Sequence, residues 1–190
     1  MSVKEEILKI VADDIHREGI KDLVNWLVQS DFFVAPASTK YHGDHEGGLA
    51  EHSLAVYKNL KAFSRIYYSM TGVKNWNPET LAIVALFHDL CKIGCYKTEM
   101  RWRKNSMNQW EQYPTYKFEE DFTFGGHGSK SVYLAQNFIK LTPDEAVAIN
   151  CHMGAWDAST YSNPSSAYES CHLAWLLHIA DEAASYVNRK

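Results

Sequence analysis

The segment "LFHDLCKIG", Leu86 to Gly94, sets a histidine and an aspartate side by side at the end of an apolar run. Burying such a pair among apolar residues is costly unless the two polar groups have partners. Taken alone, His88 and Asp89 fit a structural turn about as well as a functional site. The other histidines and carboxylates of the chain must therefore be considered together with this pair.

His52 and Asp181 extend the pair to a set of four donor residues on three different predicted helices. Two imidazoles and two carboxylates, with no thiolate, suit Mn, Fe, Co, Ni, Zn or Mg better than a structural cysteine–zinc site would. Helical bundles often build metal sites from such inward-facing side chains. The set therefore indicates a binding site for one or two divalent metal ions.

Three segments, in chain order, resemble the H…HD…D signature of the HD-domain superfamily of metal-dependent phosphohydrolases. They are "GGLAEHSLAVY", "LFHDLCKIG" and "LLHIADEAAS", and the resemblance covers residues 49–187. It implies an enzyme in which His52, His88, Asp89 and Asp181 bind metal. The loop and the insertion also resemble those of small phage-encoded and prophage-encoded HD hydrolases.

Two more segments, "GGHGSKS" and "INCHMG", resemble the extra histidine motifs of two-metal members, such as HD-GYP-like and YfbR-like proteins. The resemblance implies His127 and His152 as ligands of a second ion, with Asp89 bridging both ions. Neighbouring residues of a helix diverge by about 100°. We therefore expect His88 and Asp89 to point in different directions, with His88 serving one ion only.

The substrate side is expected to be cationic. Lys92 matches the lysine of the family's "HD-[IL]-x-K" pattern, which implies a phosphate contact and a catalytic role beside Asp89. Arg101, Trp102 and Arg103, in "RWRK", would supply charge for a phosphate and a flat ring for a base. A hairpin that packs its aromatic side chains on the helices explains these three residues equally well.

Three other polar residues accompany the motifs. Lys130 lies near a predicted helix start, where free N–H groups favour phosphate. Glu51 would orient His52, act as an acid or base, or cap its own helix. His178, three residues before Asp181, would either support that ligand or pack in the core, and packing is the preferred interpretation.

The hydrophobic pattern predicts a mainly α-helical fold. Apolar residues recur at helical spacing over 3–18, 20–30, 49–70, 128–140 and 167–187, and further helices begin near Pro78 and Pro143. Alternating aromatic and charged residues predict a β-hairpin insertion over 95–122. The turn-forming residues predict loops over 35–48, which include His42, and over 157–166. We expect one HD-like helical bundle over 1–190, with N-terminal helices and a loop over 1–48 and a core over 49–187.

Composition narrows the class further. The chain has 190 residues, 46% of them hydrophobic, and a net charge of -4, which makes a long nucleic acid an improbable partner. No apolar run reaches the roughly 18 residues of a membrane helix, and "MSVKEEILK" is not a signal peptide, so we expect a cytoplasmic protein. The four cysteines form no CxxC pair, and Cys91 and Cys95 are expected to be small buried thiols.

With the resemblance, these features predict a metal-dependent phosphohydrolase of nucleotides that cleaves a phosphomonoester or triphosphate with metal-activated water. One alternative is a phosphodiesterase or 3′–5′ exonuclease that acts on short oligonucleotides or cyclic nucleotides. Another is a sensor that binds metal or nucleotide without turnover, and a third is a helical bundle with chance histidines. The sequence leaves the native metal, the substrate and the oligomeric state open.

Overall fold

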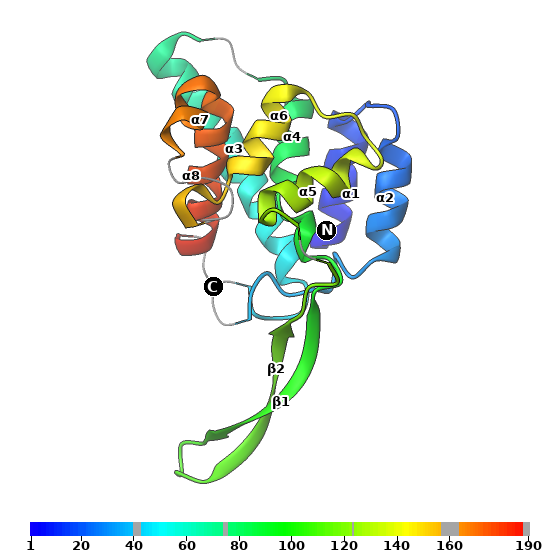
Figure 1. Ribbon diagram of the computed structural model, residues 1–190, viewed down its shortest axis with the longest axis vertical. Coiled ribbons are helices and arrows are strands. Elements are labelled where there is room, and N and C mark those ends of the chain that lie inside the picture. Colours follow the sequence, from blue (N-terminus) through cyan, green and yellow to red (C-terminus); the bar gives the residue numbers. More distant parts are fainter. Residues whose placement is uncertain (40–42, 74–75, 123, 157–163, 188–190) are drawn as a thin grey trace.

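The computed structural model describes residues 1–39, 43–73, 76–122, 124–156 and 164–187, and within them the chain is mainly helical (Figure 1). The helices are α1 (Val3–Asp14), α2 (Ile20–Gln29), α3 (Gly48–Thr71), α4 (Pro78–Phe87), α5 (His127–Gln136), α6 (Pro143–Cys151), α7 (Ser165–Ser170) and α8 (His172–Tyr186). Short 3-10 turns are η1 (Leu90–Lys92) and η2 (Gly154–Trp156), and the strands are β1 (Tyr96–Lys104) and β2 (Trp110–Phe118). The predicted helical bundle with a small hairpin is confirmed.

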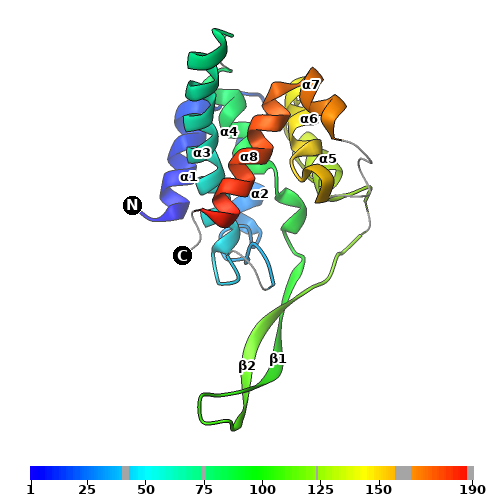
Figure 2. The ribbon, with the colours of Figure 1, turned by 90° about the vertical axis from the view of Figure 1, so that its left-hand side faces the viewer.

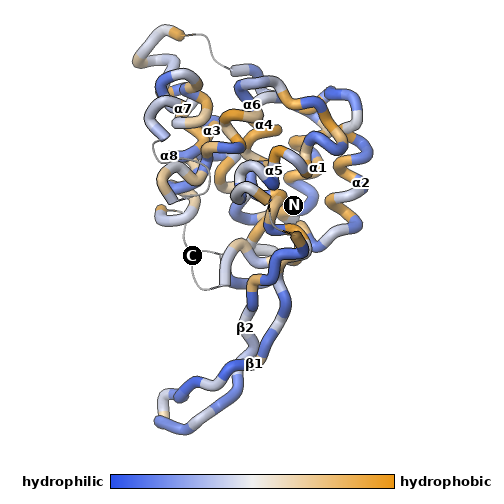
Figure 3. The backbone as a smooth tube through the Cα atoms, viewed as in Figure 1, coloured by the Kyte–Doolittle hydropathy of each residue, from blue (hydrophilic) through white to orange (hydrophobic). Residues whose placement is uncertain are grey.

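Helix α4 is the centre of the bundle. Every residue from Leu81 to Phe87 is buried, because α1, α3 and α6 all pack against α4. A helix that is apolar on all sides must be enclosed in this way. Its start is fixed by Pro78 in the first turn and by the side chain of Asn77, which accepts a hydrogen bond from the backbone of Thr80. Figure 3 shows the apolar segments gathered in the helical body.

Arg17, in the segment between α1 and α2, connects the N-terminal helices to the core. Its Nη2 lies 3.1 Å from Oε1 of Glu145 and 3.2 Å from Oε2 of Glu79. Glu145 is fully buried, and it also accepts hydrogen bonds from the backbone of Thr142 and from the hydroxyl of Thr80. One guanidinium therefore holds the first turns of α4 and α6 together.

The hairpin projects from the helical body in both views (Figures 1 and 2). Its antiparallel register runs from the pair Tyr96–Phe118 at the base to Lys104–Trp110 near the tip. Asn105 closes the tip, because its side chain accepts hydrogen bonds from the backbone N–H groups of Met107 and Gln109. The hairpin predicted over 95–122 is therefore present, but its outer half does not pack on the helices.

Three predicted helix boundaries differ from the structure. The first helix ends at Asp14 instead of residue 18, because the backbone at Ile15 is extended. The helix expected over 128–140 ends at Gln136. The last predicted helix, 167–187, is broken by the extended backbone of Cys171 into α7 and α8.

The two predicted loops lie partly outside the described residues. His42 and residues 157–163 of the second predicted loop lie outside the described residues. Among the residues that the structure does describe, no helix is both long and apolar enough to cross a membrane.

Candidate metal centre

His88 and Asp89 converge, and the divergence expected from helical geometry is wrong. Helix α4 ends at Phe87, and Asp89 has left the helical conformation with φ −109° and ψ 23°. As a result Nε2 of His88 lies 3.3 Å from Oδ2 of Asp89, and both side chains are buried. Because α4 ends before this pair, the side chains of His88 and Asp89 point toward the same place. This helix end was not predicted from the sequence.

His152 stands at the end of α6 as His88 stands at the end of α4. The Nδ1–H of His88 donates to the carbonyl of Ala85 (2.8 Å), and that of His152 donates to the carbonyl of Ile149 (2.6 Å). Nε2 of His152 then lies 3.6 Å from Oδ1 of Asp89. Both rings sit at helix C-termini, whose partial negative charge favours a cation.

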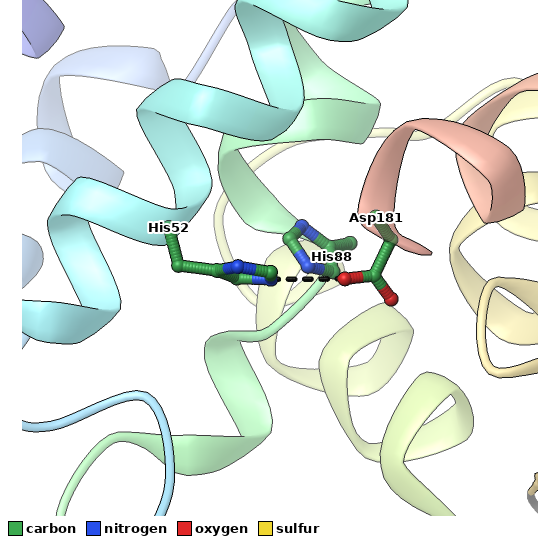
Figure 4. Close-up of side chains that lie close together, drawn as sticks. All are labelled: His52, His88 and Asp181. Atoms are coloured by element: carbon green, nitrogen blue, oxygen red, sulfur yellow. Dashed lines mark ion pairs between the residues drawn. The ribbon is translucent and has the colours of Figure 1, made fainter. Parts of the chain in front are cut away.

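His52 and Asp181 approach the same cluster from α3 and α8. Nε2 of His52 lies 3.0 Å from Oδ1 of Asp181 and 3.7 Å from Oδ2 of Asp89. Figure 4 shows His52, His88 and Asp181 pointing toward one another from three elements. The donor atoms of these three residues lie within 4.8 Å of one another, and so do those of His88, Asp89 and His152.

His127, the first residue of α5, adds a third donor group. Its ring nitrogen, the Sγ of Cys91 and a carboxylate oxygen of Asp89 also lie within 4.8 Å of one another. The thiol of Cys91 is 3.9 Å from Oδ1 of Asp89, a contact that was not predicted from the sequence. Burial, together with the charge of Asp89, raises the pKa of Cys91, so the thiol stays protonated and acts as a weak donor.

The charges of the cluster favour a cation. Burial opposes ionisation of Asp89, but Lys92 and His88 outweigh it and hold its pKa well below the ordinary value. Burial likewise opposes protonation of His88, and the Asp89 carboxylate overcomes this and raises the His88 pKa. For Asp181, the interaction with His52 overcomes burial and lowers the pKa. The two carboxylates are therefore ionised and draw positive charge between them.

The residues present fit a divalent metal ion. Among the described residues, Nε2 of His88 and Nε2 of His152 are buried and make no hydrogen bond. Because each Nδ1 donates to a carbonyl, only Nε2 is left to face the Asp89 carboxylate, and the two acceptors need a cation between them: a proton, which the raised His88 pKa favours, or a metal ion, which would displace that proton. That arrangement is repulsive until a cation lies between the donors, and imidazole nitrogen with carboxylate oxygen suits divalent transition metals.

A cavity of about 580 Å³ opens onto this cluster. Lys92 lies in its wall, with Nζ 2.7 Å from Oδ2 of Asp89. Its lining includes the donor residues Asp89, His127 and Asp181 and the aromatic residues Tyr96, Phe118 and Trp156. Candidate metal ligands, a cation and flat apolar surfaces therefore face the same space.

The structure does not bring every candidate to this cavity. The ammonium of Lys130 is buried 2.8 Å from Oδ1 of Asp121 and is not part of the cavity lining. Arg101, Trp102 and Arg103 lie on β1, in the part of the hairpin that projects away from the helices (Figure 2). The three hairpin residues therefore lie away from the histidine cluster, and the Lys130 ammonium is held by Asp121.

Glu51 and His178 have defined partners. Glu51 is exposed, and its Oε2 lies 3.2 Å from Nε2 of His45. His178 donates from Nδ1 to the backbone carbonyl of His152 (2.7 Å), and its ring stacks on Tyr168. His178 is half-buried, and its hydrogen bond supports the backbone of a cluster residue.

Comparison with known protein families agrees with this geometry. The family model of the HD domain matches residues 49–185, so the chain belongs to the HD domain family. Members of this family are generally metal-dependent phosphohydrolases, which bind divalent metal ions. Comparisons with curated proteins and with solved structures found no match.

Proposed function

We propose that the protein is a metal-dependent phosphohydrolase that acts on nucleotides. The observation that supports this proposal most strongly is the pair of Nε2 atoms, on His88 and His152, that face the Asp89 carboxylate without a hydrogen bond. Two buried lone pairs beside an ionised carboxylate form a site for a cation. Family membership makes phosphate-ester hydrolysis the general chemistry of such a site.

Six residues are proposed to hold two adjacent ions. His52, His88, Asp89 and Asp181 would bind the first, and Asp89, His127 and His152 the second. The two carboxylate oxygens of Asp89 face His88 and His152 respectively, which supports a bridging role. When bound, divalent ions supply polarisation of a phosphoryl group and a lowered pKa for coordinated water.

Lys92 is proposed to bind the phosphate of the substrate. Burial opposes its charge, but the Asp89 carboxylate outweighs this and raises the Lys92 pKa, so the ammonium stays protonated. An ammonium has three N–H donors. Lys92 therefore has donors left for a phosphoryl oxygen in the cavity while it holds Asp89. Lys92 would stabilise negative charge that develops on the phosphoryl group during hydrolysis.

The cavity supports a nucleotide over a simple phosphate ester. Its volume of about 580 Å³ falls within the roughly 300–1,000 Å³ typical of small-molecule sites. Tyr96, Phe118 and Trp156 would offer flat surfaces to a base, while Lys92 and the metal cluster take the phosphates. Such a division between aromatic and charged walls matches the two halves of a nucleotide.

The proposal is tested by phosphate release from a panel of nucleoside mono-, di- and triphosphates with Mn, Co, Ni or Mg added. Turnover of a nucleotide that depends on metal, and that Asp89→Ala abolishes, is the expected result. The same panel should contain cyclic nucleotides and short oligonucleotides, which report the alternative phosphodiesterase reaction. A protein that binds metal and hydrolyses none of these compounds contradicts the proposal and supports a sensor.

A further inference from the structure

The hairpin has two chemically different faces. Residues paired across antiparallel strands share a face, and alternate residues along a strand share it too. One face, called the aromatic face below, is made by the pairs Tyr96–Phe118, Thr98–Tyr116, Met100–Pro114, Trp102–Gln112 and Lys104–Trp110. The opposite face is made by the pairs Lys97–Lys117, Glu99–Thr115, Arg101–Tyr113 and Arg103–Glu111.

The aromatic face begins inside the candidate active site. Tyr96 and Phe118, the pair at the base of the hairpin, both line the cavity that contains Asp89 and Lys92. The ring of Phe118 also stacks on that of His127, with centroids 6.2 Å apart. A ligand in the cavity therefore has a continuous surface leading from the metal cluster onto the hairpin.

The outer end of the aromatic face is open to solvent. Trp102 is 62% exposed, Trp110 65% and Met100 54%. Trp102 and Trp110 are diagonal neighbours in the register, a relationship that places Cα atoms about 7–8 Å apart. The ammonium of Lys104 lies 5.7 Å from the Trp110 ring. Large exposed aromatic side chains beside a cation indicate a binding surface.

The charge of the hairpin is opposite to that of the whole chain. Residues 96–118 carry five basic and two acidic side chains, a net charge of +3, in a chain whose net charge is −4. Arg103 pairs with Glu111 and also lies 4.8 Å from the ring of Tyr113. Exposed ion pairs of this kind contribute only about 0–1 kcal/mol, so their cations exchange readily to other anions.

We propose that the aromatic face of the hairpin binds a short single strand of nucleic acid, whose bases stack on Trp102 and Trp110 and whose end enters the cavity. The delivery of that end to the metal cluster rests on the proposed function, whereas the stacking does not. On this face the Lys104 ammonium lies beside Trp110 and next to Trp102, and aromatic rings beside a cation are the pattern that binds single strands without sequence preference. This pattern favours a polyanion with flat bases over a second copy of the acidic chain.

The shape of the hairpin also favours a single strand over a duplex. Each strand has nine residues and extends about 30 Å, enough for several nucleotides. The ribbon twists along its length (Figure 2), which turns the aromatic face around the hairpin axis. A flexible single strand can follow such a surface, and its unpaired bases are available for stacking.

The test measures binding of a fluorescein-labelled oligothymidylate, roughly 12 nucleotides long, to the full chain by anisotropy, with EDTA present to prevent turnover. The double variant Trp102→Ala/Trp110→Ala should bind at least about tenfold more weakly than the wild type. Trp175→Ala, which removes an exposed tryptophan from α8, is the matched control and should bind like the wild type.

A second variant tests the charges. Lys104→Gln, which removes the cation beside Trp110 on the aromatic face, should lower the slope of log affinity against log salt by about 0.7, the value for one lost phosphate contact to a single strand. An unchanged affinity in the tryptophan double variant overturns the proposal. The proposal is also overturned if sedimentation velocity shows that the wild type is a dimer and that the tryptophan double variant is a monomer. The aromatic face would then be a contact between two copies of the chain.

The outcome separates this inference from the proposed function. Tryptophan-dependent oligonucleotide binding by a protein that hydrolyses no phosphate ester supports the binding face and contradicts the hydrolase. If the protein hydrolyses mononucleotides and its oligonucleotide binding does not depend on Trp102 and Trp110, the result supports the hydrolase and overturns the binding face.

Discussion

The ammonium of Lys92 and the carboxylate of Asp89 form a buried ion pair with Nζ 2.7 Å from Oδ2. His88 and His152 approach the same carboxylate, the first at Oδ2 and the second at Oδ1. The Asp89 carboxylate therefore contacts both the Lys92 ammonium in the cavity wall and the histidines at the ends of α4 and α6. Substitutions of the two members of the pair should consequently have different effects.

Asp89→Ala should remove bound metal and activity together, because it deletes the carboxylate shared by both proposed ion sites. Lys92→Ala should leave the metal bound and lower the turnover rate about 100-fold, the loss expected for one charge-stabilising donor. Metal analysis of the dialysed variants, with phosphate release measured in parallel, checks both. Full metal occupancy in Asp89→Ala would show that this residue does not bridge the ions.

His152→Ala should reduce the number of ions bound per chain. His178→Ala should weaken metal binding about 10- to 100-fold, because its hydrogen bond to the carbonyl of His152 would be lost. Titration of each variant with Mn or Co gives the stoichiometry and affinity. His45→Ala, an exposed histidine that pairs with Glu51, is the control and should match the wild type. Equal stoichiometry in His152→Ala would remove this residue from the ligand set.

Gly128→Ala should separate α5 from α6. A Cβ atom at Gly128 would lie 2.3 Å from the backbone oxygen of Asn150, so the backbones must move apart. Overpacking of this kind lowers the free energy of unfolding by about 1–3 kcal/mol. Gly125→Ala is a matched control, because its Cβ would lie 3.7 Å from Oγ of Ser129. Urea unfolding measures both variants, and equal stabilities would contradict the close helix contact.

Stability should fall in acid through Glu145. Burial opposes ionisation of Glu145, but hydrogen bonds from Arg17 and Thr142 outweigh it and lower the pKa from its ordinary value of 4.5. A lowered pKa in the folded state stabilises the protein above pH 4.5, and this contribution is lost as the pH falls further. Urea unfolding of the wild type and Glu145→Gln from pH 7 to 3 measures it.

Glu145→Gln should lower the stability at neutral pH and flatten the acid dependence below about pH 4.5. Arg17→Ala should cost about 3 kcal/mol at neutral pH, because it leaves the Glu145 carboxylate buried without its cation. Identical acid slopes in wild type and Glu145→Gln would show that another carboxylate governs acid unfolding.

Helix positions were predictable where local signals were strong. Thr142, Pro143 and Glu145 mark the start of α6, and the structure has the corresponding capping box. The break at Cys171 was not predictable, because the sequence there contains neither glycine nor proline. The extended backbone at that residue depends on tertiary packing, since its thiol contacts the carbonyl of Asp144 on α6.

Part of the candidate site was likewise predictable from the sequence, and part of it was not. Residue types grouped His52, His88, Asp89 and Asp181 as candidate metal ligands, the family resemblance added His152, and the structure brings these residues together. The direction of His88 and Asp89 was not predictable, because it depends on where α4 ends. Lys130 was predicted to bind phosphate because it lies near a helix start, but in the structure its ammonium binds Asp121.

Arg17 lies outside residues 49–185, yet it influences the geometry of the candidate metal cluster. It joins Glu79 and Glu145 at the starts of α4 and α6, and the far ends of these helices present His88 and His152. Each helix is about 14–15 Å long. The separation of two imidazoles is thus set partly by an ion pair at the opposite end of both helices. A chain lacking its first helices would retain every donor residue but lose the contact that fixes their spacing.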